Sequence, residues 1–138
     1  LVDVSDIVGA GSTGENTHLV RALLEVAQGL RTYAPLRDPV AVAALWGRPQ
    51  GAAVDLDVGG RLDPATNPSL RIRGRLLRTV DSPHWGKTAV VDCDHLQLVL
   101  TERPPLPLKP SFYGDLGLSV WRADAVVVKN FFHYRWYY

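Results

Sequence analysis

The clearest periodic pattern in the chain begins at Leu70, where apolar and charged residues alternate. One side of an extended chain would carry Leu70, Ile72, Gly74 and Leu76, and the other side would carry Arg71, Arg73 and Arg75. This period of two predicts a half-buried strand with one solvated face. Residues 88–91 and 96–100 predict a hairpin around Asp92, Cys93 and Asp94.

A helical period follows a glycine-rich segment near the start. Leu19, Leu23, Val26 and Leu30 recur at spacings of four, three and four, which predicts a helix that buries these residues. A second helix is predicted from Pro39 to about Trp46, because Asp38 can cap it and proline suits the first helical position.

Further strands are predicted at residues 1–6, 53–58 and 125–128, and the last of these is a continuous apolar run that suits a strand buried on both faces. Residues 1–30 then form strand, glycine loop and helix, the opening of a βα unit. Residues 61–69 and 104–107 predict loops, and residues 110–116 a short helix. We therefore expect one α/β (mixed α+β) domain over residues 1–138: a mixed sheet with packed helices and an antiparallel hairpin region in the middle.

Composition supports a folded chain and narrows its partners. Apolar residues make up 46% and charged residues 21%, and no apolar run approaches the about 18 residues of a membrane span. The net charge is +1, which gives no general attraction to nucleic acid or to an anionic membrane. The single cysteine, Cys93, has no internal partner for a disulfide, so we expect a reducing, cytoplasmic location.

Two features predict that the sequence is a fragment of a longer protein. It contains no methionine, so Leu1 is not expected to be a translation start. The last eight residues hold six aromatic side chains, and we expect such rings to be covered, by this chain or by absent material.

The best local candidate for chemistry is the segment with Gly9, Gly11 and Gly14, which matches G-x-G-x-x-G before a predicted helix. Backbone N–H groups in this setting can bind an anion such as a nucleotide phosphate. A dinucleotide site also requires an acidic residue about 20 positions later, whereas Asp38 lies further on and suits a helix cap. Glu15 would repel a pyrophosphate, so a structural turn or the binding of another polar group is favoured.

Three acidic residues, Asp3, Asp6 and Glu15, bracket the glycine segment. Paired carboxylates can bind a metal or transfer protons. The favoured alternative is that they cap the helix and accept hydrogen bonds from the loop amides. Lys129, His133 and Arg135 leave the last predicted strand, where open α/β sheets place ligand contacts. The favoured alternative is that Lys129 and Arg135 extend to solvent or pair with carboxylates.

Nothing in the sequence predicts a self-contained catalytic centre. His18, His84, His95 and His133 lack the spacing of a zinc site. Asp92 and Asp94 should raise the pKa of Cys93 and weaken it as a nucleophile.

Several segments, taken in order, resemble the C-terminal domain of microcystinase-C-like (MlrC-like) proteins. Residues 6–17 resemble D-N-x-G-x-G-x-x-G-D-x-T, residues 38–43 resemble D-P-E-A-V-A, residues 58–64 resemble L-G-G-K-x-D-P, and residues 126–135 resemble V-V-V-K-[SN]-x-x-H-[FY]-R. Ile7, Glu15 and Arg61 depart from the usual Asn, Asp and Lys. The segment 82–86 is shorter than the glycine-rich insertion common in the family.

The resemblance implies the C-terminal domain of a zinc-dependent hydrolase of the metallopeptidase family, which acts on peptide or amide bonds; the namesake degrades linearised microcystin. The Asp and His metal ligands belong to a larger N-terminal domain, so this chain should hold no catalytic residue, metal or cofactor and should be inactive alone. The expected partners are that domain, a peptide-like small substrate and a second copy of the protein. The residues expected to face the interdomain cleft are Asp6, Gly9, Gly11, Gly14, Glu15, Thr17, Lys129, His133 and Arg135.

Two other functions remain open at this point. The chain could be a stand-alone module that binds an anion or nucleotide through Gly9 to Gly14. It could also be a structural or oligomerisation domain whose aromatic C-terminus forms the interface.

Overall fold

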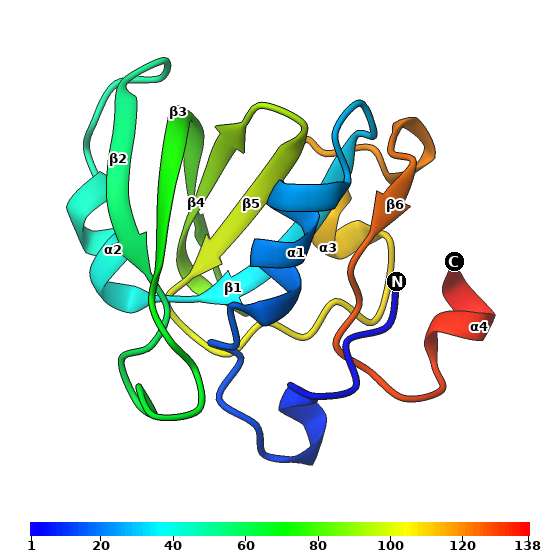
Figure 1. Ribbon diagram of the computed structural model, residues 1–138. Coiled ribbons are helices and arrows are strands. Elements are labelled where there is room, and N and C mark those ends of the chain that lie inside the picture. Colours follow the sequence, from blue (N-terminus) through cyan, green and yellow to red (C-terminus); the bar gives the residue numbers. More distant parts are fainter.

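The alternating segment forms the longest strand, β3 (Leu70–Ser82), which pairs antiparallel with β2 (Ala53–Val58) and with β4 (Gly86–Cys93). The computed structural model describes residues 1–138 and contains one six-stranded sheet in the order β2-β3-β4-β5-β1-β6 (Figure 1). β5 (Leu96–Thr101) forms a hairpin with β4, whereas β1 (Thr32–Arg37) runs parallel to β5 and to β6 (Ala125–Val126). The expected mixed sheet with an antiparallel middle is therefore confirmed.

Four helices and two 3₁₀ turns accompany the strands. They are α1 (His18–Val26), α2 (Pro39–Leu45), α3 (Ser111–Gly114), α4 (Tyr134–Tyr137), η1 (Val8–Ala10) and η2 (Val120–Arg122). α2 begins as predicted, because the Asp38 carboxylate accepts a hydrogen bond from the Ala41 N–H at 2.9 Å. None of the helices combines the length and apolar character needed to cross a bilayer.

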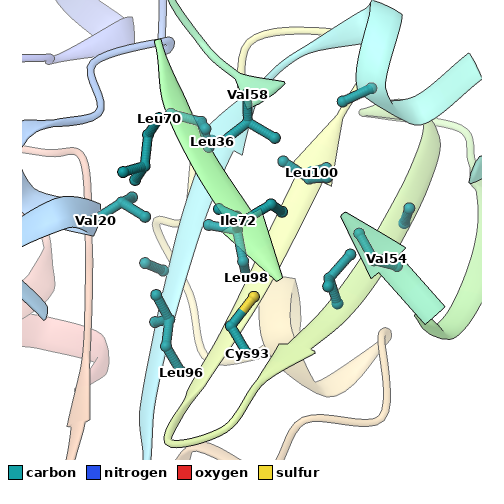
Figure 2. Packing of buried hydrophobic residues seen from close by; sticks show 14 of the residues in the cluster. Val20, Leu36, Val54, Val58, Leu70, Ile72, Cys93, Leu96, Leu98 and Leu100 are labelled. Carbon is teal, nitrogen blue, oxygen red and sulfur yellow. The ribbon is translucent and has the colours of Figure 1, made fainter. Parts of the chain in front are cut away.

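Alternate residues of each strand point to opposite faces, so the sheet has two apolar cores. The larger core joins α1 and α2 to one face and includes Leu98 and Leu100 of β5; Figure 2 shows its strand residues gathered around Ile72. The smaller core lies on the other face, where Val99 packs with Phe112 and Tyr113 of the α3 region. The two layers fix the sheet firmly, which makes its edge a rigid base for loops.

The arginine side chains of β3 lie on the part of the smaller-core face that no helix covers. Arg71 pairs with Asp55 at 2.6 Å and with Asp57 at 3.2 Å, both on β2, and Arg73 approaches Asp55 at 3.5 Å. This surface is the solvated face that the alternating pattern predicted, with its charges paired across strands.

The buried face of α1 is rotated relative to the predicted face, which is only partly correct: Leu23 is buried and Leu19 packs partly buried against the larger core, as predicted. Val20, Leu23 and Ala27 are buried, whereas Val26 and Leu30 are exposed. The predicted and the observed buried residues share Leu23. At 100° per residue the two sets extend to opposite sides of Leu23 around the helix axis, so the apolar spacing alone fits either orientation. Leu30 also lies beyond the end of the helix, after Gly29 with its φ of +83°.

The strand predicted at residues 1–6 is only an isolated parallel bridge between Val2 and Val128. The chain leaves the sheet after Asp3, because the Asp3 carboxylate accepts hydrogen bonds from both the N–H and the hydroxyl of Ser5. The glycine segment therefore begins within the 3₁₀ turn η1, and the expected βα unit does not form there. The run 125–128 is likewise a two-residue strand whose extension, Val127 and Val128, is buried between β1 and the N-terminal residues.

The parallel strand β1 was not predicted, since Pro35 interrupts its short apolar run. Successive residues of a parallel strand hydrogen-bond to alternate neighbours. Thr32 N–H donates to His95 before β5, and the Tyr33 carbonyl accepts from Val127 on the β6 side. Pro35 shares the orientation of Tyr33, and β6 has ended at that level, so the missing N–H breaks no ladder.

We expect Leu98→Ala to destabilise the protein by about 2–5 kcal/mol, because Leu98 is fully buried in the larger core and its truncation leaves a cavity. Leu62→Ala is the matched control, since Leu62 is 58% exposed and its loss should change stability by less than about 0.5 kcal/mol. Urea denaturation of both variants measures the difference. Equal midpoints for the two would contradict this packing.

Candidate functional site

Loops gather at the edge of the sheet where the three parallel strands end. β1 ends at Arg37 and β5 at Thr101, and the chain that leaves β6 reaches this edge at Lys129. The glycine segment lies across it, because the Arg37 N–H donates to the Gly14 carbonyl at 2.7 Å. Ligand sites of open α/β sheets form at this position, outside the carboxyl ends of the strands.

A buried ion cluster joins the two ends of the chain beneath the glycine segment. The Lys129 ammonium donates to Asp6 at 2.7 Å and to Asp3 at 2.8 Å, and all three side chains are buried. The Asp6 carboxylate also accepts from the Gly14 N–H at 2.8 Å and the Asn16 N–H at 3.1 Å. The Asp6 carboxylate therefore links the glycine segment to the residues that follow β6.

The environment of Asp6 keeps its carboxylate ionised. Burial acts to raise the pKa of Asp6, but the charge and hydrogen bond of Lys129 and the two backbone N–H groups outweigh it. The pKa of Asp6 therefore lies below its usual range. Because both carboxylate oxygens are already hydrogen-bonded, Asp6 holds the loop and offers little as a proton acceptor for a substrate.

Glu15 performs the same task for the next loop. Its carboxylate accepts hydrogen bonds from three successive backbone N–H groups, those of residues 61, 62 and 63, at 2.9–3.1 Å. The Thr17 hydroxyl donates to the Pro68 carbonyl at 2.5 Å, further along that loop. The loop 61–69 is thus held against the start of α1.

Asp38 is a further buried carboxylate of this edge. One oxygen caps α2 and the other accepts from the Gly59 N–H at 2.8 Å. Arg61 approaches the same carboxylate at 3.4 Å. The turn after β2 is therefore fixed to the helix after β1.

Gly59 is required by both its backbone and its neighbours. Its φ is +69°, and a Cβ there would lie 2.4 Å from the Thr17 methyl and 2.8 Å from the Glu15 carbonyl oxygen. Only glycine allows the turn after β2 to pass this close to the start of α1.

These fixed loops surround an open polar hollow of about 510 Å³. It is lined by Ser5, Asp6, Gly11, Ser12, Thr13, Asn16, His18, Asp63, Thr66 and Asn67. Hydroxyl and amide side chains dominate the lining, and no apolar side chain contributes. Such groups can donate to a carbonyl oxygen and accept from an N–H, which is what recognition of a peptide group requires.

The nucleotide interpretation of the glycine segment is not favoured by this geometry. The N–H groups of Gly14 and Asn16 are used by Asp6, and those of Gly11 and Ser12 donate to carbonyls of residues 7 and 8. The protein's own carboxylate therefore occupies the position in which an anion would accept these hydrogen bonds. The alternative predicted for the acidic residues, that they bind loop amides, describes Asp6 and Glu15.

The nine expected cleft residues do not form one cluster. Asp6, Gly14 and Lys129 are in direct contact, and Gly11 lines the hollow; Glu15 and Thr17 support its wall. Gly9 is exposed and packs near Leu106. His133 and Arg135 are exposed on the C-terminal segment, where they contact Trp136 and Tyr134 and neither Asp6 nor Lys129. These two side chains therefore do not join the cluster around Asp6, because the chain turns outward after Asn130; that they face an interdomain cleft stays a prediction.

Cys93 is buried at the end of β4 and is not at the hairpin tip. Burial, with a smaller effect of Asp92, raises the pKa of Cys93 to about 12, which makes the thiol unreactive.

The residues present do not fit a zinc site. No group of three or more His, Cys, Asp or Glu side chains is arranged to hold a metal ion. His18 and His95 contact backbone carbonyls of Thr66 and Leu23 through Nε2, at 3.0 Å each, in separate parts of the molecule. The zinc ion that the family resemblance implies therefore has no ligand set in these residues.

Sequence reasoning missed the wall formed by Asp63, Thr66 and Asn67, which was predicted only as a loop. A signal was present in the polar residues that follow Gly59 and Gly60. What the pattern lacked was any indication that Glu15 and Thr17 would hold this loop beside the glycine segment.

The fold and the hollow define an α/β domain that offers a polar binding surface at the carboxyl edge of its parallel strands. The model of the family described as MlrC C-terminus matches residues 1–138, and the chain belongs to that family. Microcystinase C from Sphingomonas sp is 27% identical over 139 aligned residues, which cover 94% of this chain and 27% of that protein.

A solved structure shows the same fold. The crystal structure named "Putative metallopeptidase from MESORHIZOBIUM SP. BNC1" matches with a TM-score of 0.87 and 24% identity over 98% of this chain and 30% of that chain. The chain thus spans less than a third of the length of these two relatives.

We expect Asp6→Asn to destabilise the protein by about 3 kcal/mol at neutral pH, because Lys129 would lose one partner of a buried ion cluster. The lowered pKa of Asp6 means that this stabilisation is complete above the unfolded value of about 4 and is lost as the pH falls through the folded value. Urea denaturation from pH 7 to pH 3 should therefore show a gap to wild type that narrows below about pH 4. Asp81→Asn, at an exposed carboxylate of β3, is the control, and a gap independent of pH would contradict the ion cluster.

Gly59→Ala should cost more than Gly29→Ala, although both residues have positive φ. A Cβ at Gly29 meets no atom within 4 Å, so that change carries only a backbone cost of about 1–2 kcal/mol. The collision at Gly59 adds a displacement of Thr17 and Glu15. Thermal unfolding of the two variants side by side measures the excess, and equal shifts would disprove the close approach.

Proposed function

We propose that this chain is the C-terminal domain of a zinc-dependent hydrolase of peptide or amide bonds, and that its polar hollow forms one wall of the substrate cleft. The observation that carries the proposal is the hollow itself, an open surface of hydroxyl and amide groups on rigid loops at the carboxyl edge of the sheet. Membership of the MlrC C-terminus family and the names of the two relatives support the class of reaction.

The role proposed for these residues is binding and orientation. Ser12, Thr13 and Asn67 can donate to and accept from the peptide groups of an extended substrate. Asp63 is acceptor-only when ionised and suits an amino group of the substrate. Asp6, Glu15 and Asp38 keep the wall in place, so the substrate meets a surface that needs no rearrangement.

The zinc ion and the residues that hold it are proposed to belong to the N-terminal part of the full-length protein. Zinc would polarise the scissile carbonyl and activate water for its hydrolysis. This chain would then hold the substrate against that centre, and it should not hydrolyse peptides on its own.

We expect Ser12→Phe in the full-length protein to lower kcat/KM for short linear peptides by about tenfold or more, because the ring would fill the hollow. Ser119→Phe is the matched control, since Ser119 is exposed just before η2 and outside the hollow. Mass spectrometry of the products gives kcat/KM, and elemental analysis should show unchanged zinc in both variants. Equal activity of the two variants would rule out the hollow as the cleft wall.

A further inference from the structure

We propose that the aromatic segment at residues 131–137 docks on the N-terminal part of the full-length protein. The proposal rests on the proposed function, because it takes the chain to be one domain of a longer hydrolase. Four rings of the segment lie open to solvent: Phe131, Phe132, Trp136 and Tyr137 are 41–74% exposed. Large apolar rings gathered on one exposed element mark an interaction site.

The rings are arranged as a surface and are not scattered. Phe131 and Phe132 contact each other with their centroids 5.0 Å apart, and His133 meets Trp136 edge to face at 5.5 Å. Aromatic side chains packed in this way lose little freedom on binding, which favours an interface.

The base of the segment is held firmly to the domain. Lys129 is fixed by Asp3 and Asp6, and the buried Asn130 side chain accepts from the Tyr134 N–H at 3.0 Å. The Lys109 ammonium lies 5.2 Å from the centre of the Tyr137 ring. These contacts hold the segment in place, while Phe131, Phe132 and Trp136 stay exposed to solvent.

The position of the N-terminus identifies the occupant. The Leu1 ammonium donates to the Val126 carbonyl at 2.7 Å, and the Val128 N–H donates to the Leu1 carbonyl at 2.9 Å. The N-terminal residues therefore run beside residues 126–128, and Figure 1 shows the helix α4, which follows them, standing away from the body of the domain. This chain matches a family described as a C-terminus and covers only 27% of the curated relative, which favours a larger part of the full-length protein N-terminal to this domain.

Polypeptide that precedes Leu1 therefore enters next to the base of the aromatic segment. Tethering at this point gives the N-terminal part a high effective concentration at the rings, an advantage that a second copy of the protein lacks. Since Lys129 links the segment to Asp6, docking would also set how the hollow faces the catalytic part.

Hydrogen–deuterium exchange on the full-length protein tests the proposal. We expect the amides of residues 131–137 to exchange about tenfold or more slowly than those of an exposed short helix, with no dependence on protein concentration. The double substitution Phe132→Ser and Trp136→Ser should remove this protection and increase proteolytic cleavage between the two parts. Trp121→Ser is the matched control, because Trp121 is 81% exposed on η2 and lies outside the segment.

Three results would overturn the docking proposal. The first is rapid exchange of the segment in the wild-type protein, which needs no variant to interpret. The second is protection that increases with concentration alongside a dimer in sedimentation, which would assign the rings to a second copy. The third is an equal effect of the Trp121 control.

Zinc content and peptide hydrolysis, measured on the same wild-type sample, separate the two proposals. A protected segment in a protein without hydrolytic activity would support docking and count against the proposed function. An active, zinc-bound enzyme with an unprotected segment would do the reverse.

Discussion

Buried carboxylates that accept hydrogen bonds from backbone N–H groups hold together the edge of the sheet that carries the candidate site. Asp6, Glu15 and Asp38 are each almost completely buried, and each accepts hydrogen bonds from loop amides. A loop without regular structure leaves many N–H groups unpaired, and burying them unpaired is costly. A carboxylate satisfies two or three of them at once, which lets irregular loops pack as tightly as secondary structure.

The charges of these carboxylates explain other choices in the sequence. Asp6 is buried with Asp3 nearby, and two buried negative charges are tolerable because Lys129 lies between them. Glu15 and Asp38 are stabilised mainly by backbone dipoles, with Arg61 near Asp38. Asp6 and Lys129 are separated by almost the whole chain, so their contact joins the N-terminal and C-terminal segments of the domain and also fixes the glycine loop. Its position at the start of the aromatic segment connects the site to the proposed interface.

Elements with a local signal were predictable from the sequence. The alternation in β3 and the Asp38-Pro39 start of α2 are short-range patterns, and the structure follows them. β1 was missed because the tolerance of Pro35 depends on where β6 ends, which no local window contains. Which residues of α1 are buried depends on the side from which the sheet packs against the helix. The strand predicted at residues 1–6 does not form because Ser5 donates hydrogen bonds to the Asp3 carboxylate.

The candidate site shows the same division. Its acidic and glycine residues were identified from the motif and Lys129 from the end of the last predicted strand, and the contact of Asp6 with Lys129 joins these two groups. The wall at residues 63–67 and the outward turn of His133 and Arg135 depend on tertiary contacts, which a spacing argument does not contain. The family resemblance supplied the order of the segments, but it did not specify which residues face the same space.

The glycine motif also has a different physical meaning here from the one its letters suggest. In a nucleotide-binding loop, glycines expose N–H groups to an external phosphate. In this domain Gly14 turns its N–H inward to Asp6, and the small residues allow the loop to wrap around a carboxylate of the same chain. The anion that accepts these N–H groups is therefore a side chain of the protein itself. The groups that face the hollow are then hydroxyl and amide side chains and not backbone N–H groups. A site of that composition is suited to a polar, peptide-like ligand, so the internal carboxylate determines the chemistry of the surface above it.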